Sequence, residues 1–277
     1  MKVYDPSLPT TRFFIEQIEL FMPVLAWLSE SKTLRENILK PVSTLKGVYK
    51  AEADGAVYVV YIFVNGEVPG IQGITRTQTA ELAEILAHLH DAGETVPFET
   101  PGLVEDISLP FCDYLTRFLS KADIKHSELF YIVSSYADML NAAIRDALYL
   151  RDILRTGYSP LVLCHGDAHG NNVIQSERLV LSDWEDLRWA PVEADLFIHA
   201  WHPHGETLLE TYAAARSSYH VNHELLFFYT LRRRIEDVWF DIQRLTEESP
   251  NEAEKAKLLN WTRQGIEEIQ KLYESKQ

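Results

Sequence analysis

The most constraining feature of this sequence is a group of three short apolar runs, in a chain whose other apolar patterns are mostly helical. Leu161–Cys164 predicts a short buried strand. Val173–Gln175 and Leu179–Leu181 predict two more strands around a tight turn. The loop His165–Asn172 between the first two runs contains glycine, histidine, acidic and amide residues. We therefore expect a buried strand, a polar loop and a short hairpin in succession.

The predicted hairpin brings polar residues from both of its strands to one end. With the turn centred on Glu177, an antiparallel register places Asn171 opposite Asp183, with Asn172 one position further along. Directly opposed Cβ atoms lie about 5 Å apart, so these side chains are expected to be neighbours. Asp167 lies in the loop just before them. Two carboxylates and a side-chain carbonyl group at one site can hold a hard divalent cation such as Mg²⁺.

The same residue types occur together in kinase-type phosphoryl transfer. In that chemistry a carboxylate base accepts the hydroxyl proton of the substrate, while an asparagine and a second carboxylate hold Mg²⁺ on the nucleotide phosphates. Asp167, Asn172 and Asp183 have this order and spacing. The alternative is structural, with Asp167 and Asn172 as turn residues and Asp183 as the cap of the next segment. The spacing across a predicted hairpin favours the catalytic interpretation.

The motif His-Gly-Asp-x-x-x-x-Asn at His165–Asn172, followed by Asp-Trp-Glu from Asp183, resembles the signature of the aminoglycoside phosphotransferase and choline kinase-like superfamily. Ala190–Leu196 resembles the segment after this motif, most closely in the spectinomycin phosphotransferase-like branch. Phe63–Glu67 is similar to the hinge of the family, and Leu86–His90 is similar to the end of the helix that follows the hinge. The resemblance covers nearly the whole chain.

The resemblance implies an α+β, protein-kinase-like fold of two lobes. Residues 1–65 would form a nucleotide-binding N-terminal lobe, and residues 66–277 a mainly helical C-terminal lobe with the catalytic loop and the substrate side. The first two strands and the glycine-rich loop of the family would precede Lys2, where this sequence has no residues for them. We therefore expect a shortened N-terminal β lobe, weak nucleotide binding and slow turnover, with a truncated reading frame, a weakened enzyme and a nucleotide-binding relic as the open explanations.

The resemblance also implies roles for the residues of the motif. Asp167 would be the catalytic base, and Asn172 and Asp183 would be the Mg²⁺ ligands. His165 would brace the catalytic loop rather than exchange protons. Ser182 stands where the family usually has an apolar residue, which we expect to be a minor change.

On the nucleotide side, the resemblance implies that backbone groups of Ile62 and Val64 contact the adenine of ATP, or the base of GTP. Lys2 resembles the third-strand lysine that contacts the phosphates. Its partner would come from the following helix, as Glu16 or Glu19. The sequence leaves the choice between these two glutamates open.

An aminocyclitol or another amine-bearing substrate would be held by carboxylates and by aromatic faces. We expect Asp186, Glu236 and Asp237 on the substrate side, because Arg-Arg-Ile-Glu-Asp looks similar to the substrate-side helix of the family. A solvated surface position is the alternative for each of these acids. The identity of the substrate, the choice between ATP and GTP, and the oligomeric state stay open.

Composition argues against several other classes of protein. The 41 acidic and 26 basic residues leave a formal net charge of −15, which argues against nucleic-acid or anionic-membrane partners. Cys112 and Cys164 lack metal-like spacing and indicate buried thiols in a reducing compartment. The sequence shows neither a signal-peptide pattern nor the roughly 18 consecutive apolar residues of a membrane span. We expect a cytoplasmic protein.

Apolar periodicity predicts a mainly helical chain after an N-terminal hairpin. A strand at residues 1–4 precedes a helix that starts near Thr10, and Pro23 is expected to bend or divide this helix. Strands at 41–52 and 57–64 are expected to form the hairpin. Further helices are expected at residues 77–91, 126–156, 206–218, 222–246 and 252–274.

The favoured functional hypothesis is an ATP- and Mg²⁺-dependent phosphotransferase that acts on a hydroxyl group of a small molecule, such as an aminoglycoside or aminocyclitol. One alternative is a catalytically weak nucleotide-binding relic of the same fold. Another is a metallophosphoesterase, because Gly166–Gly170 matches the Gly-Asp-x-His-Gly fragment of that class. The sequence lacks the earlier Asp-x-His and the later Gly-Asn-His that a metallophosphoesterase also needs.

Overall fold

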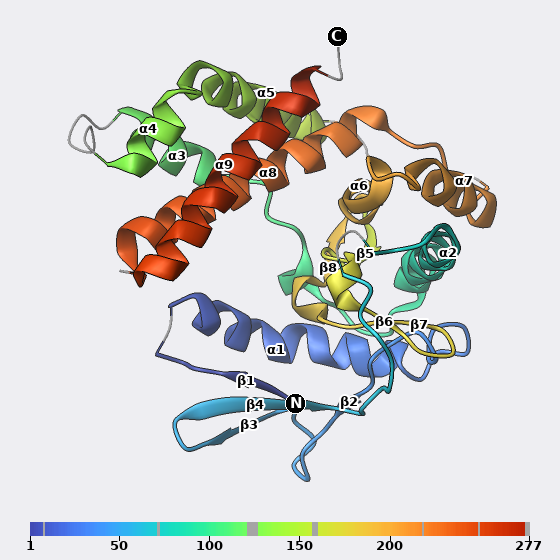
Figure 1. The fold of residues 1–277 in the computed structure, drawn as a ribbon. Helices are drawn as coiled ribbons and strands as arrows, with labels where there is room; N and C mark the ends of the chain where they lie inside the picture. The colour runs from blue at the N-terminus through green and yellow to red at the C-terminus, as the bar shows by residue number, and fades with distance from the viewer. Residues whose placement is uncertain are drawn as a thin grey trace. The chain divides into compact units, whose positions relative to one another are not determined.

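The computed structural model describes residues 1–7, 9–70, 73–120, 127–156, 160–217, 219–248 and 250–274 (Figure 1). Contacts divide the chain into two compact units. The first unit comprises Met1–Glu105 and Pro160–Asn222, and the second comprises Asp106–Ser159 and His223–Gln277. The lobe boundary after residue 65 is a functional division and stays a prediction.

The first unit begins with a small antiparallel sheet around a central strand, β4 (Ala56–Tyr61). Strand β1 (Lys2–Tyr4) pairs with β4, with Lys2 opposite Val59. Strand β3 (Lys50–Ala53) forms the predicted hairpin with β4, but the single strand expected at 41–52 is divided, because β2 (Pro41–Val42) is a separate strand that also pairs with β4.

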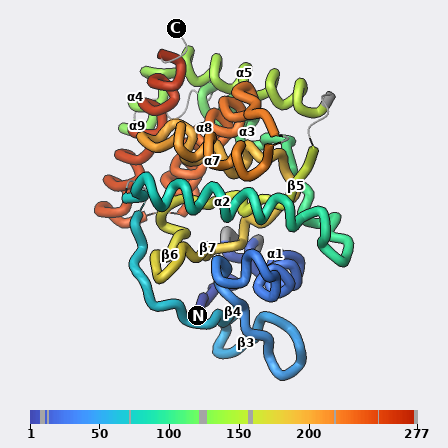
Figure 2. Tube along the Cα trace, turned by 90° about the vertical axis from the view of Figure 1, so that its right-hand side faces the viewer, coloured from blue at the N-terminus to red at the C-terminus, as the bar shows by residue number. Residues whose placement is uncertain are grey.

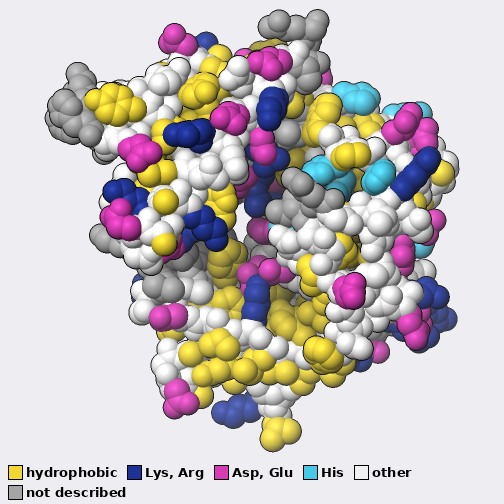
Figure 3. All heavy atoms as spheres, in the orientation of Figure 1, with side chains coloured by type: hydrophobic (Ala, Val, Ile, Leu, Met, Phe, Trp, Pro, Cys, Tyr) yellow, Lys and Arg dark blue, Asp and Glu magenta, His cyan; other side chains and the backbone are white. Residues whose placement is uncertain are grey.

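Helix α1 (Pro9–Leu28) runs along one face of this sheet (Figure 1). It remains one helix through Pro23, although we expected a bend or a division there. Its buried side chains recur at helical spacing and form much of the local core: Ile18, Phe21, Met22, Leu25 and Leu28. Hydrophobic side chains also gather on the outer surface over the sheet (Figure 3).

The remainder of the first unit surrounds the motif segment. Helix α2 (Arg76–Ala92) starts at a capping box formed by Thr75 and Gln78, and packs against α7 (Gly205–Ala215). Figure 2 shows α2 beside the hairpin of β6 (Val173–Gln175) and β7 (Leu179–Leu181). Here the Glu81 carboxylate accepts a hydrogen bond of 2.9 Å from the Leu179 amide.

The predicted register of the motif hairpin is confirmed, because Val173 lies opposite Leu181 and Gln175 opposite Leu179. Strand β5 (Val162–Cys164) is buried and pairs with β8 (Arg188–Ala190). Helix α6 (Glu193–Ala200) was not predicted, because it is only two turns long and therefore shows little periodicity.

The second unit consists of helices in its described residues. Helices α8 (His223–Glu247) and α9 (Glu252–Glu274) agree with the predicted ranges and form an antiparallel pair. A Cβ at Gly265 of α9 would lie 2.9 Å from a methyl group of Val238, so glycine allows the close approach of the two helices. A salt bridge of 2.8 Å joins Arg234 to Glu268.

The other helices of this unit correct one prediction and include one helix that was not predicted. The helix expected at 126–156 is divided into α4 (Glu128–Ser134) and α5 (Ala137–Thr156). The Ser135 hydroxyl donates to the Tyr131 carbonyl at 2.7 Å, and such a side-chain bond competes with helix continuation. Helix α3 (Pro110–Ser120) was not predicted, although proline at a first helical position is a start signal. Among the described helices, none is long and apolar enough to cross a membrane.

Candidate active site

Asp195 anchors the start of the motif loop. Its carboxylate accepts hydrogen bonds from the backbone amides of His165 at 2.9 Å and Gly166 at 2.6 Å, and lies 3.0 Å from Nε2 of His90. All of these groups lie in the first unit, and Asp195 and His90 are fully buried. Burial alone would raise the pKa of Asp195, but the hydrogen bonds from His90 and Gly166 and the nearby imidazoles outweigh it, so the pKa is lowered.

Gly166 gives the loop its sharp turn. Its φ is +84°, a left-handed conformation that glycine adopts without penalty. A Cβ at this position would lie 2.4 Å from the carbonyl oxygen of Asp186. Arg188 donates to the Gly166 carbonyl at 2.8 Å. The motif glycine is therefore required by both conformation and space.

His165 connects the loop to the hairpin. It is fully buried, its Nε2 lies 3.0 Å from the Ser182 carbonyl oxygen, and its Nδ1 accepts from the Asp167 amide at 3.3 Å. The ring also packs on Trp184, with centroids 4.5 Å apart. Because a carbonyl can only accept, the Nε2 atom donates and the neutral ring has its proton there. These contacts are those of a structural brace.

Asn172 and Asp167 are in direct contact. The Asn172 side-chain amide donates to the Asp167 carboxylate at 3.0 Å and to the Asp167 carbonyl at 2.8 Å. Because the nitrogen of this amide faces Asp167, its oxygen is directed to a different side. The backbone carbonyl of Asn172 accepts from the Ser182 amide at 2.9 Å, which continues the hairpin ladder to its polar end.

Asp183 follows this ladder in an unusual backbone conformation. Its φ of 62° and ψ of 65° are left-handed, and such strain in a non-glycine residue is concentrated at functional sites. Its carboxylate lies 2.5 Å from the ammonium group of Lys2 on β1. The ammonium group of Lys2 thus lies against this carboxylate oxygen.

Lys2 does not pair with Glu16 or Glu19, so that prediction is wrong. Its described partners are Asp183 and Glu185, with Nζ 2.6 Å from the Glu185 carboxylate. Glu16 and Glu19 are exposed on α1. Burial alone would lower the pKa of Lys2, but the hydrogen bonds to Asp183 and Glu185 outweigh it and raise the pKa.

Glu185 is a site residue that the sequence analysis missed. Its carboxylate accepts hydrogen bonds from both Lys2 and the Tyr4 hydroxyl. Burial and the hydrogen bond to Glu185 raise the pKa of Tyr4, so its hydroxyl stays protonated as a donor. The sequence feature that could have identified Glu185 is its position two residues after Asp183, with only Trp184 between the two acids.

Ile62 and Val64, the residues predicted to form the hinge, follow β4 in the chain. The Ile62 amide donates to the Lys40 carbonyl at 2.9 Å, and 54% of Ile62 is exposed. Beyond them, Glu67 and Gln175 exchange backbone hydrogen bonds of 2.9 and 2.7 Å. Val64 is therefore held between two paired positions, and the hinge is fixed to β6.

The three expected substrate-side acids are distributed over both units. Asp186 lies in the short 3₁₀ turn Trp184–Asp186 of the first unit, whereas Glu236 and Asp237 lie on α8 of the second. Arg233 pairs with Asp237 at 2.9 Å, so this carboxylate is already compensated. A substrate role for these acids stays a prediction.

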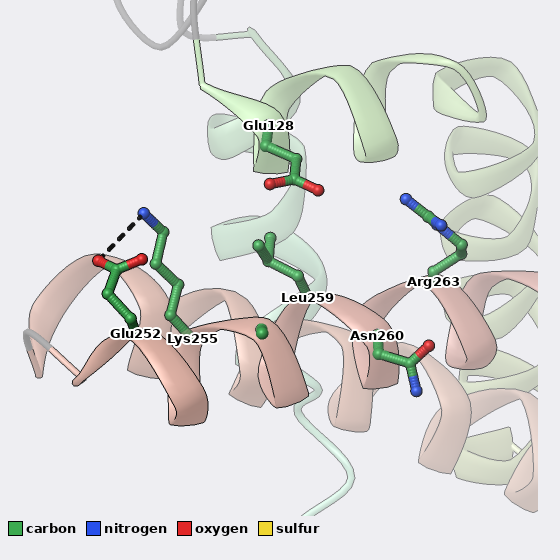
Figure 4. A pocket seen from close by; sticks show the side chains of 7 residues that line it. Glu128, Glu252, Lys255, Leu259, Asn260 and Arg263 are labelled. Carbon is green, nitrogen blue, oxygen red and sulfur yellow. Dashed lines mark ion pairs between the residues drawn. The ribbon is translucent and has the colours of Figure 1, made fainter.

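Two other features of the described residues resemble binding sites in part. His90, Cys164 and Asp195 are the one group of three His, Cys, Asp or Glu side chains among the described residues whose ligand atoms lie close enough to share a metal, but all are buried and already hydrogen-bonded. A hollow of about 220 Å³ lies between α4 and α9 of the second unit, where Glu128 faces the side of α9 that bears Arg263 (Figure 4). Its charged side chains are exposed, unlike the convergent polar groups of a ligand pocket.

The fold and the motif loop are those of a kinase-like phosphotransferase. The model of the phosphotransferase enzyme family (APH) matches residues 11–226. The chain therefore belongs to the phosphotransferase enzyme family. A comparison with curated protein sequences finds no match.

Solved structures share this fold. Spectinomycin phosphotransferase APH(9)-Ia, in complex with ADP and spectinomycin, aligns with a TM-score of 0.73 and 18% identity over 93% of this chain and 83% of that one. The GDP and kanamycin complex of APH(2")-IIIa aligns with a TM-score of 0.60 and 16% identity, over 95% and 83%. A choline/ethanolamine kinase family protein from Mesorhizobium loti gives 0.57 and 15%, over 93% and 77%. The fold is thus that of small-molecule phosphotransferases.

Proposed function

We propose that this phosphotransferase transfers the γ-phosphoryl group of ATP or GTP to a hydroxyl group of a small molecule. The observation that supports this most directly is the arrangement of three residues at the polar end of the motif hairpin: Asp167 and Asn172 are hydrogen-bonded to each other, and Asp183 follows the hairpin ladder beside Asn172. Asn172 donates to Asp167 at 3.0 Å, and the Ser182 amide next to Asp183 donates to the Asn172 carbonyl at 2.9 Å.

In this proposal Asp167 accepts the proton of the substrate hydroxyl and orients its oxygen towards the phosphorus atom. The side-chain oxygen of Asn172 and the carboxylate of Asp183 are the groups that would hold Mg²⁺. Carboxylate and amide oxygens fit a hard cation, and the ammonium group of Lys2 already lies against Asp183. When bound, Mg²⁺ would neutralise charge on the nucleotide phosphates.

The nucleotide would bind along the hinge. Ile62 and Val64 would present backbone groups to the base, with the exposed apolar surface around them covering its faces. Lys2 would approach the phosphates, held in place by Glu185. The ADP, AMP and GDP complexes among the similar structures support nucleotide use of this kind.

For the acceptor we propose an amine-bearing molecule of the aminoglycoside or aminocyclitol class. The net charge of −15 favours the approach of cationic substrates. Asp186, in the first unit, is the proposed contact for its amino groups, and the substrate roles expected for Glu236 and Asp237 of the second unit stay predictions. We also propose a cytoplasmic location, because Cys112 and Cys164 are both free thiols, as expected in a reducing compartment.

The test is an acceptor screen. The purified chain is incubated with Mg²⁺ and either ATP or GTP, together with spectinomycin, kanamycin or choline, and nucleoside diphosphate release is measured. We expect release above the level without acceptor, and a phosphorylated product by mass spectrometry. If the nucleotide binds measurably but no acceptor raises the release of nucleoside diphosphate above the acceptor-free level, the result would instead indicate the nucleotide-binding relic.

A further inference from the structure

His169 lies on the catalytic loop two positions after Asp167, and the proposed function gives it no role. Its ring atom Nε2 lies 3.4 Å from the Asp167 carboxylate oxygen Oδ2. The same carboxylate oxygen accepts the hydrogen bond from the Asn172 amide. Two side chains of one loop therefore approach a single oxygen of the proposed base.

The other ring nitrogen of His169 determines where its proton lies. Nδ1 accepts a hydrogen bond of 3.1 Å from the Asn171 amide, and so caps the 3₁₀ turn Gly170–Asn172. A nitrogen that accepts has no proton, so the neutral ring must have its proton on Nε2. The ring edge that faces Asp167 is consequently a donor.

The backbone around His169 is held independently of its ring. The Ala168 carbonyl lies 2.9 Å from Nε2 of the buried His199, and the His169 amide donates to the Asp167 carbonyl at 2.8 Å. Burial lowers the pKa of His199 to about 4, so it remains a neutral donor. The loop thus presents the His169 ring to Asp167 from a fixed backbone.

We propose that His169 is a positioning residue for Asp167. Its Nε2–H restrains the carboxylate in the orientation that receives the substrate proton. It acts on the same carboxylate oxygen that accepts the hydrogen bond from the Asn172 amide. The proposal rests on the proposed function, in which Asp167 is the base. A separation of 3.4 Å is long for a hydrogen bond, and catalytic hydrogen bonds commonly shorten when substrate binds.

Two variants separate the cap from the contact with Asp167. In His169→Asn the side-chain oxygen can still cap the Asn171 amide, because asparagine is a strong capping residue, but no donor reaches Asp167. In His169→Gln the longer amide can still place a donor near Asp167, at the expense of the cap. His88→Asn, at an exposed histidine of α2, is the matched control.

We expect His169→Asn to lower kcat about tenfold to a hundredfold, at or below the lower end of a general acid–base contribution, because Asp167 itself is kept. The KM for nucleotide and the melting temperature are expected to stay near wild type, since the cap is kept. His169→Gln should recover part of kcat despite a lower melting temperature. An unchanged kcat in His169→Asn, or a kcat that follows melting temperature in both variants, would overturn the proposal.

A second measurement does not depend on turnover. Long-range ¹H–¹⁵N spectra in mildly alkaline buffer report the tautomer of each histidine, and the His169→Asn spectrum assigns the signal. We expect the Nε2–H form for His169, with a shift when Asp167 is changed to Asn. An Nδ1–H form, or no response to Asp167→Asn, would contradict the contact. Full transfer activity in Asp167→Asn would instead refute the role of Asp167 as the base. The spectra would then still test, by themselves, whether His169 contacts Asp167.

Discussion

The ammonium group of Lys2 and the carboxylate of Asp183 are 181 positions apart in the sequence and 2.5 Å apart in the structure. The side chain of Lys2, on the first strand of the chain, therefore reaches the polar end of the motif hairpin. Glu185 receives the same ammonium group at 2.6 Å and also the hydroxyl of Tyr4, so β1 is joined to the motif by three polar contacts. Lys2, the proposed phosphate ligand, and Asp183, one of the two proposed metal ligands, form one connected charged group with Glu185.

The proposed division between base and metal ligand can be measured. Asp167→Asn should lower phosphoryl transfer by about a hundredfold or more while leaving Mg·nucleotide affinity within a few-fold. Asp183→Asn should weaken Mg·nucleotide binding itself, because it removes charge next to the ion. Calorimetry and single-turnover kinetics distinguish the two results. Equal losses of nucleotide affinity in both variants would contradict the assignment.

Glu185 is expected to control nucleotide affinity through Lys2. In Glu185→Gln the ammonium group loses one of its two carboxylate partners, and a charge-assisted hydrogen bond contributes about 1.5–3 kcal/mol. We expect nucleotide to bind about tenfold more weakly. Tyr4→Phe is the matched control, because it removes a hydroxyl from Glu185 and keeps the charge. Glu16→Gln, on the exposed side of α1, should have no effect on the nucleotide Kd measured by calorimetry.

His199 should make stability depend on pH. Burial lowers its pKa from 6.5 to about 4. Between these values the unfolded chain binds a proton that the folded chain does not, so the free energy of unfolding falls as pH decreases through this window, by about 3 kcal/mol.

His199→Gln keeps a donor for the Ala168 carbonyl but has no titratable ring. Urea unfolding across this pH range should therefore show a flatter profile for His199→Gln than for wild type. His88→Gln, at an exposed position, should leave the slope unchanged. Parallel profiles for His199→Gln and wild type would show that His199 does not cause the dependence.

Gly166 and Gly55 provide a matched pair for the motif turn. Both have a positive φ, but a Cβ at Gly55 meets nothing within 4 Å, whereas one at Gly166 would lie 2.4 Å from the Asp186 carbonyl oxygen. Gly55→Ala should cost about 1–2 kcal/mol from the left-handed conformation alone. Gly166→Ala should cost about 3 kcal/mol or more and abolish transfer. Similar losses in thermal unfolding would show that the loop relaxes around the added methyl group.

The sequence by itself determined the local features of the motif. The hairpin register follows from the short turn centred on Glu177 between Val173–Gln175 and Leu179–Leu181, so the relation of Asn172 to Asp183 could be predicted. The brace role expected for His165 agrees with its contacts, because the two groups that it joins lie within 17 positions of it. Helices α8 and α9 were found because each is long and strongly periodic.

Only the tertiary structure decided which distant groups complete the site. Lys2 pairs with Glu185 rather than with a glutamate of α1, because β1 is placed by its pairing with β4 while Glu16 and Glu19 face solvent. Likewise, His90 reaches Asp195 across 105 positions. The sequence pattern around a charged residue does not indicate which residue it will pair with. The energy of an ion pair depends on the separation and burial of the two charges rather than on their distance in the sequence. The packing of strands and helices sets that separation, and it therefore determined the residues that surround Asp167 and Asp183.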